Sequence, residues 1–394
     1  MGYYVSSSNG GNKIRKIDLA GVITTYAGTG AAGYSGDGMP ATLAKLYIPT
    51  GLVLDASENL YFADAGNNAI RRIDKLTGII TTVAGNGTGS FGGDGSAATA
   101  AMLFDPQDIC FDRKGNLYIA DYYNYRVRKV DVSGIITTIA GVGSLGYGGD
   151  SSLADTSKIG EIVTICSDTF NNIYIGDNIN SRIFKIDTFG FITTFAGTDT
   201  GYIFNGDAIP ATAANINPNV MRFDDTGNLY VAVDEGSSRV RKITTTGYIY
   251  TVAGDGSLFH SGDGGPATAA GFNNPDGIAF DACGNLYVPE GMAAGYVRKI
   301  SFYPSCDIPL TTTNVKNNTQ IFLYPNPAYS QLTITSATNI HEVTITNLIG
   351  QQVLSQVYDM ERAEVNVSGL PPGVYVVRVR DEDGNVVVRK VVKE

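Results

Sequence analysis

The chain has 394 residues, of which 48 are glycine, 14 proline and 4 cysteine, and only 17% are charged. High glycine and low charge are typical of a turn-rich all-β protein. The net charge of −10 argues against binding to a phosphate backbone, and two histidines, His260 and His341, leave little material for histidine-rich zinc sites or Ser-His-Asp triads.

Two sequence markers recur along the first three quarters of the chain with the same period. The run Asn-Leu-Tyr-aliphatic-Ala-Asp, or a close variant, occurs six times, and Ile-Thr-Thr-x-Ala-Gly, or a close variant, occurs five times. Both repeat every 56 or 57 residues. The tyrosines and the closing glycines of the two markers are Tyr4, Tyr61, Tyr118, Tyr174, Tyr230 and Tyr287, and Gly28, Gly85, Gly141, Gly197 and Gly254. A shared period of this length predicts a repeat architecture.

Within one unit the sequence predicts four short strands separated by turn signals such as Lys114-Gly115-Asn116. The expected strands are residues 108–112, 116–121, 126–131 and 134–141. Four antiparallel strands make one blade of a propeller, and six blades closed into a ring leave no long free edge. We therefore predict an all-β fold that begins with a six-bladed β-propeller.

The repeated text resembles the bacterial NHL-type propeller repeat. The matching residues are GNLYIADYYNYRVRKVD (115–131), GIITTIAG and inserts like GDGGPATAA, and the resemblance covers roughly residues 1–305. Two units depart from the pattern: Phe184 replaces a recurring arginine, and Val233 replaces a recurring aspartate. Neither position is therefore assigned a catalytic role.

The first and last units are incomplete. The first begins at its second strand (residues 2–6), and the last has no Ile-Thr-Thr-x-Ala-Gly strand after Ile300. We expect the reading frame to extend upstream of Met1 and the chain to be truncated at its N-terminus. That extension would also supply the signal peptide that residues 1–11 do not contain.

A change of composition marks a second domain. Residues 306–321 form a polar linker rich in threonine and asparagine, and residues 322–394 show alternating apolar and polar positions with a turn signal at Asp383-Gly384-Asn385. This pattern predicts a small Ig-like β-sandwich.

Residues 322–394 resemble the C-terminal type A sorting domain of the type IX secretion system of Bacteroidetes. The resemblance rests on LYPNP, NLIGQQV, GLPPGVYVVRV and the terminal RKVVKE. It assigns a sorting-signal role to Pro325, Asn326, Pro327, Gly350, Gly369, Leu370, Gly373, Tyr375, Lys390 and Lys393.

The resemblance also implies a destination. It implies entry to the periplasm by a cleaved signal peptide, transport by the type IX machinery, and removal of the domain. Release or attachment to surface lipopolysaccharide would follow. The alternative is an accessory sandwich without an address function. No stretch of 18 apolar residues predicts a membrane span.

The four cysteines fall into two predicted groups. An exported protein can form disulfides, and Cys283 and Cys306 are expected at the same end of the last blade, so we predict that they pair. Cys110 and Cys166 share one position in neighbouring inner strands, which predicts two buried free thiols.

The insert before each first strand carries a Gly-Asp pair with an aromatic residue or His260 three residues earlier. The set comprises Tyr34, Phe91, Tyr147, Phe204 and His260, with Asp37, Asp94, Asp150, Asp207 and Asp263. These residues could form a ring of sugar platforms, but repetition in every unit favours packing of the insert onto its blade. Calcium sites are disfavoured because no insert has the acidic density of a calcium loop.

Positions that differ between units are better candidates for ligand contacts. The first candidate set lies at the entrance to the inner strands and includes Thr50, Gln107, Asp108, Asn219 and Asp276, with Val163 and Thr164 in the same positions of another unit. The second set is Tyr122, Tyr123 and Tyr125, which cluster in one unit only. A solvated rim is the alternative for both.

These observations predict an exported, noncatalytic binding propeller for a glycan or protein ligand, with no catalytic residue, metal or cofactor. The inner strands are mainly apolar, and no nucleophile and base pair is visible in them. A metal-dependent propeller lyase or hydrolase is the first alternative. The second is a fragment of a larger surface adhesin.

Overall fold

A computed structural model describes most of the chain. The described residues are 3–7, 10–18, 21–198, 203–233, 237–291, 295–302, 322–347, 351–382 and 386–393. The chain divides into two compact units, Met1–Ile308 and Pro309–Glu394. The predicted linker, residues 306–321, lies in a segment outside the described residues.

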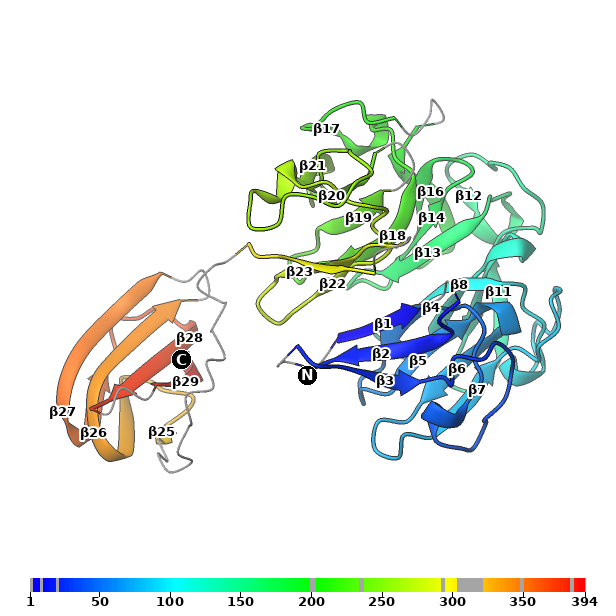
Figure 1. Cartoon of the computed structure of the whole chain (residues 1–394). Coiled ribbons are helices and arrows are strands. Elements are labelled where there is room, and N and C mark those ends of the chain that lie inside the picture. The colour runs from blue at the N-terminus through cyan, green and yellow to red at the C-terminus, as the bar shows by residue number, and fades with distance from the viewer. Residues whose placement is uncertain are drawn as a thin grey trace. The chain divides into compact units, whose positions relative to one another are not determined.

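The first unit consists of six antiparallel sheets, here called blades 1 to 6, arranged around a common centre (Figure 1). Blade 1 contains β1 (Tyr3–Ser7), β2 (Lys13–Ile17) and β3 (Ile23–Ala27); blade 2 β4 (Pro49–Leu54), β5 (Leu60–Asp64), β6 (Ala69–Ile73) and β7 (Ile80–Ala84); blade 3 β8 (Pro106–Phe111), β9 (Leu117–Asp121), β10 (Arg126–Val130) and β11 (Ile136–Ala140).

Blades 4 and 5 each gain a short fifth strand from their insert. Blade 4 contains β12 (Ser152–Leu153), β13 (Ile162–Ser167), β14 (Ile173–Asp177), β15 (Arg182–Ile186) and β16 (Phe191–Gly197); blade 5 β17 (Ile209–Pro210), β18 (Pro218–Phe223), β19 (Leu229–Val233), β20 (Arg239–Ile243) and β21 (Tyr248–Ala253); blade 6 β22 (Ala279–Phe280), β23 (Leu286–Pro289) and β24 (Val297–Ile300). The predicted all-β propeller is confirmed.

Helical structure in the described residues is limited to single 3-10 turns in the inserts and loops. They are η1 (Ala41–Leu43), η2 (Ala65–Asn67), η3 (Ala98–Ala100), η4 (Tyr122–Asn124), η5 (Ala154–Thr156), η6 (Ala211–Ala213) and η7 (Ala267–Ala269). None of these described helices is long and apolar enough to cross a membrane.

The core of the propeller lies between successive blades. Ala63 and Ile70 of blade 2, for example, pack with Ile109 and Ile119 of blade 3 in one buried cluster. Burying a side chain the size of isoleucine contributes about 1.5–3 kcal/mol. The inner strands of blades 2 to 5 also contact one another in turn, β4 with β8, β8 with β13 and β13 with β18, and β4 contacts β1 of blade 1.

The first and last blades meet through an aromatic contact. Tyr3 of β1 stacks on Tyr287 of β23 with ring centroids 4.2 Å apart. Tyr287 belongs to one copy of the recurring sequence marker, and Tyr4, which follows Tyr3, belongs to another. The ring is therefore joined where two copies of that marker meet. Stacked aromatic pairs add about 0.5–1.5 kcal/mol beyond the burial of their area.

The second unit is a five-stranded antiparallel sheet with its own buried core. Its strands are β25 (Phe322–Tyr324), β26 (Gln331–Asn347), β27 (Gln352–Asn366), β28 (Gly373–Asp381) and β29 (Val386–Lys393). In β28, buried Tyr375, Val377 and Val379 alternate with exposed Arg378 and Arg380. This period of two is the pattern of a strand with one buried face.

Candidate functional site

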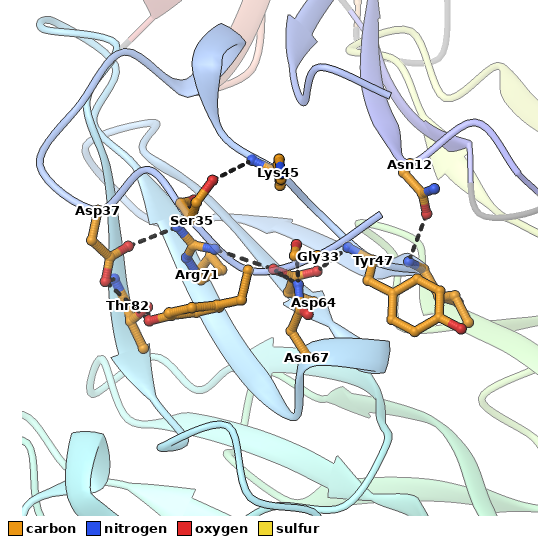
Figure 2. A network of polar contacts seen from close by, with 12 residues as sticks. Asn12, Gly33, Ser35, Asp37, Lys45, Tyr47, Asp64, Asn67, Arg71 and Thr82 are labelled. Atoms are coloured by element: carbon orange, nitrogen blue, oxygen red, sulfur yellow. Dashed lines mark hydrogen bonds and ion pairs between the residues drawn. The ribbon is translucent and has the colours of Figure 1, made fainter. Parts of the chain in front are cut away.

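The residues that recur from blade to blade hold the inserts to the sheets. In blade 2 (Figure 2), the Arg71 guanidinium donates to Asp64 of β5 at 3.2 Å and to Asp37 of the insert at 2.7 Å. The same guanidinium lies 4.7 Å from the ring centre of Tyr34, another insert residue. The Gly-Asp pair and its aromatic partner therefore fasten the insert, as the packing interpretation predicts.

Other blades repeat this contact with small variations. Arg128 bonds Asp121 and Asp94 in blade 3, and Arg298 bonds Glu290 and Asp263 in blade 6. His260 takes the aromatic position of blade 6, where its ring stacks on Tyr296 at 4.1 Å. In blade 4, where Phe184 replaces the arginine, Tyr147 stacks on it at 5.6 Å.

The variable positions at the start of the inner strands coincide with irregularities in strand pairing. The inner strands of blades 2 to 5 each shift register there, between Thr50 and Leu52, Pro106 and Ile109, Ile162 and Thr164, and Pro218 and Val220. A bulge leaves a residue unpaired and redirects its side chain. Gln107, Asp108, Val163 and Asn219 are the residues released from pairing in this way.

Asp108 ties three inner strands together. Its carboxylate accepts hydrogen bonds from the Thr164 hydroxyl at 2.9 Å and from both terminal nitrogens of Arg222 at 3.0 and 3.2 Å. The backbone N–H groups of Ile109 and Ile165 complete the set. Asp108 was predicted to contact a ligand; in the structure its carboxylate oxygens accept these hydrogen bonds, and the ligand role stays a prediction.

Arg222 supplies the positive charge that pairs with the Asp108 carboxylate. Burial alone would lower the pKa of Arg222, but the charge and hydrogen bonds of Asp108 raise it above its usual value. The neighbouring thiols of Cys110 and Cys166 are free and buried, and burial raises the pKa of both. These thiols are therefore protonated and unreactive near neutral pH.

The other entrance residues form smaller contacts. Asn219 donates to Asp276 at 3.0 Å, which links blades 5 and 6, and Asp276 also accepts from Asn274. Burial raises the pKa of Asp105, and the nearby Gln107 side chain opposes this rise. The hydroxyl of Thr50 is buried without a hydrogen-bond partner among the described residues. The structure brings Asn219 and Asp276 together and leaves Thr50 separate from that pair.

An aromatic group lies on the rim of blade 3. The rings of Phe104 and Tyr123 are 5.0 Å apart, and those of Tyr122 and Tyr123 are 4.7 Å apart. Phe104 and Tyr123 keep 40% and 45% of their surface exposed. We call Phe104, Tyr122 and Tyr123 the rim aromatics.

A carboxylate from blade 4 faces the rim aromatics. The Tyr122 hydroxyl donates to Glu161 at 2.6 Å, and burial together with this hydrogen bond raises the pKa of Tyr122. Tyr125 ends η4 in the left-handed region with φ of 50°, so its role is to turn the chain. The rim therefore combines two exposed rings with a carboxylate held in place.

Two family models match parts of the chain. Residues 89–258 match the teneurin NHL domain, and residues 322–394 match the secretion system C-terminal sorting domain. The chain is an NHL-repeat propeller with a type IX sorting domain. The sorting domain makes the protein secreted or attached to the outer-membrane surface, and it implies interaction with the type IX machinery.

Individual relatives share the propeller part. Protein SUPPRESSOR OF QUENCHING 1, chloroplastic, of Arabidopsis thaliana is 27% identical over 254 residues, which is 61% of this chain and 24% of that protein. Teneurin-4 of Mus musculus is 29% identical over 224 residues, which is 50% of this chain and 8% of teneurin-4. The chain thus spans a quarter or less of the length of these curated relatives.

A solved structure shows the same fold. The auxiliary nutrient binding protein from Bacteroides ovatus is 15% identical, with a TM-score of 0.50 over 72% of this chain and 62% of that chain. At this identity the similarity extends to the fold of the NHL propeller alone.

The predicted sorting-signal residues lie before β26, around the start of β28 and in β29. The Asn326 side chain accepts a hydrogen bond from the backbone N–H of Val392 at 2.8 Å. The LYPNP motif is thereby held to the terminal strand, β29. The Tyr375 hydroxyl donates to the Pro371 carbonyl at 2.8 Å. Pro325 and Pro327 flank Asn326 before β26, Gly369 and Leu370 precede β28, Gly373 begins it, and Lys390 and Lys393 belong to β29. Gly350 lies outside the described residues.

Cys283 is disulfide-bonded. The predicted partner, Cys306, lies outside the described residues, so the pairing stays a prediction.

Sequence reasoning missed Glu161, Arg222 and Phe104. Arg222 had a visible signal, because it occupies the inner-strand position where Cys110 and Cys166 stand in other units. The signal for Phe104 was weaker: blade 2 also has an exposed aromatic residue, Tyr47, at the same position. For Glu161 no signal pointed to Tyr122, which is 39 residues away.

Proposed function

We propose that this protein is an exported, noncatalytic binding propeller whose ligand docks on the rim aromatics beside Glu161. The observation that carries the proposal is the exposure of Phe104 and Tyr123 next to a fixed carboxylate on blade 3. Exposed aromatic rings grouped at one place are a common feature of binding surfaces.

The chemistry of the rim favours a glycan over a protein segment. A flat ring offers a face on which the apolar side of a sugar stacks, and the remaining acceptor capacity of Glu161 can take hydrogen bonds from sugar hydroxyls. Asp105, half-buried beside Phe104, adds a second carboxylate. A protein ligand is the other outcome of the screen described below.

The alternative of a metal-dependent lyase or hydrolase has less support from the channel. Such a site needs carboxylates or histidines that converge and remain available to a metal ion. Asp108 is instead held by Arg222 and Thr164. Within the described residues, no three His, Cys, Asp or Glu side chains are grouped to hold a metal.

A binding screen tests the proposal. The full chain is applied to arrays of bacterial surface glycans and of peptides, next to Tyr123→Ala and Phe189→Ala. Phe189 is 83% exposed in the turn between β15 and β16, on the opposite end of the sheets from the rim. We expect Tyr123→Ala to weaken the strongest glycan signal at least tenfold and Phe189→Ala to leave it unchanged.

Two outcomes would contradict the proposal. Equal binding by Tyr123→Ala and the unmodified chain would remove the rim as the site. Recovery of the bound glycan in cleaved form, measured by mass spectrometry, would show that the protein is an enzyme and not a noncatalytic binding protein.

A further inference from the structure

Blades 2 and 3 neutralise a buried arginine with a buried aspartate. In blade 2, Asp64 accepts from the Arg71 Nη1 atom at 3.2 Å, from Asn67 at 2.9 Å and from the Tyr47 backbone N–H at 2.7 Å. In blade 3, Asp121 accepts the same three kinds of donor, from Arg128, Asn124 and Phe104. The carboxylate is therefore the centre of a constant set of donors.

Blade 5 keeps the arginine and loses the aspartate. Val233 pairs with Arg239 as Asp64 pairs with Ala69, so it stands in the position of the aspartate. Ser237 precedes Arg241 by four residues, as Asn67 precedes Arg71, and the amide side chain is thereby replaced by a shorter hydroxyl. Val233 therefore removes the carboxylate acceptor, and Ser237 replaces the amide donor by a shorter hydroxyl.

The donors around Val233 are left without that acceptor. The Arg241 side chain is 0% exposed, and its Nη2 atom bonds Asp207 at 3.1 Å and the Gly206 carbonyl at 2.8 Å. Among the described residues, its Nη1 atom has no hydrogen-bond partner, and neither has the Ser237 hydroxyl, which belongs to a residue 1% exposed.

The charge balance at this place is also incomplete. Arginine stays protonated in proteins, and burial lowers the pKa of Arg241 without removing its charge. Its carboxylate partner in the described part of the chain, Asp207, is 42% exposed and also accepts from Thr251. A buried cation with unpaired donors is strongly destabilising unless another anion compensates it.

We propose that a small monovalent anion, chloride in the first instance, binds inside blade 5 between Arg241 Nη1 and the Ser237 hydroxyl. The anion takes the place that the aspartate carboxylate occupies in blades 2 and 3. Donors of the same kinds already surround a negative charge there, so the site needs no rearrangement of its neighbours. The role of the ion is structural, and it is separate from the ligand site on the rim.

Thermal unfolding of the full chain in chloride and in gluconate, at equal ionic strength, tests the inference. Gluconate is too large for the site and serves as the reference anion. We expect a saturable rise of about 2–4 °C in Tm with chloride, because a ligand that binds only the folded state stabilises it by mass action. Identical Tm values in the two salts at every concentration would overturn the proposal.

Two variants place the effect in blade 5. Val233→Asp supplies the missing carboxylate, so its Tm should no longer depend on chloride. The double variant Asp121→Val/Asn124→Ser copies the blade 5 arrangement into blade 3 and should make the chloride response larger. A chloride response of normal size in Val233→Asp would contradict the assignment.

Crystals of the unmodified chain grown in bromide provide a readout that requires no variant to fold. An anomalous peak within hydrogen-bond distance of Arg241 Nη1 is the expected result. A water molecule at that position, without anomalous signal, would overturn the proposal by showing that blade 5 is hydrated rather than occupied by an anion.

Discussion

At the scale of single residues, the buried arginines are the strongest determinants of the blades. Arg71, Arg128 and Arg241 are the largest fully buried side chains among the described residues. Each joins an insert to its sheet through a carboxylate of the insert, and in blades 2 and 3 through a second carboxylate of the sheet. Removing one partner of such a group leaves the other charge buried and unpaired.

Arg128→Leu should lower the free energy of unfolding by about 3–5 kcal/mol, because Asp121 would remain buried without its cation. Urea unfolding of the full chain measures the loss in the propeller transition. Arg72→Leu is the control, since Arg72 and its partner Asp74 are each 30% exposed and such pairs contribute about 1 kcal/mol or less. Equal losses in the two variants would show that the buried pair is no stronger than a surface pair.

At the scale of elements, the glycine that closes each Ile-Thr-Thr-x-Ala-Gly run allows two segments of a blade to touch. Gly141 has φ of 87°, and a Cβ atom there would overlap the carbonyl oxygen of Tyr125 at the end of η4. The strand β11 therefore ends against the loop that carries the rim aromatics. This contact makes the marker glycine a requirement for placing the candidate site.

Gly141→Ala should destabilise the propeller by about 1–3 kcal/mol more than Gly134→Ala. Gly134 has φ of 80°, and a Cβ atom added there would have no neighbouring atom within 4 Å. Both variants therefore share the strain of a positive φ, and only Gly141→Ala adds a steric overlap. Parallel thermal and urea unfolding measure the difference. Similar stabilities would mean that the loop at Tyr125 moves aside at little cost.

At the scale of the whole molecule, the two units have separate tasks. The propeller carries the rim, while residues 322–394 carry the export signal and close on themselves through Asn326 and Val392. The repeated residues that build the blades make their contacts within the propeller. Removal of the sorting domain is therefore expected to stop export without unfolding the propeller.

In a host with a type IX system, and with the host's signal peptide placed before Met1, the full chain should reach the cell surface or the medium. A variant without residues 322–394 should stay in the periplasm. Val357→Ser, a change at a residue 71% exposed on β27, is the control and should be exported normally. Surface delivery of the truncated variant would contradict the sorting role; fractionation and immunoblotting measure the outcome.

The repeat period made the propeller predictable, because two markers with one spacing indicate six units of the same kind, the first and last of them incomplete. The packing role of the inserts was also visible, since residues such as Asp37 and Tyr34 recur in each unit. Asp108 was harder to interpret. Its partner Arg222 is 114 residues away. Asp108 lies in the irregular part of β8, whereas Arg222 pairs regularly with Tyr230 in β18, so the two meet only because the inner strands of successive blades pack together.

The candidate site was predicted in part for a similar reason. The cluster of Tyr122 and Tyr123 is local in sequence, so it was found. Glu161 and Phe104 come from other segments and join the cluster only when successive blades pack together. The missing acceptor beside Arg241 also needed the structure, because Val233 by itself is an ordinary strand residue.

We infer that the repeated residues build the scaffold, and we propose that the rim of blade 3 binds the ligand. Hydrogen–deuterium exchange of the full chain, with and without the strongest glycan from the array, tests this proposal most directly. We predict that added protection is confined to residues 102–105, 122–125 and 161–163. Protection centred on the inserts around Asp37 and Asp207, or on the turns at the opposite end of the blades, would contradict binding at the rim.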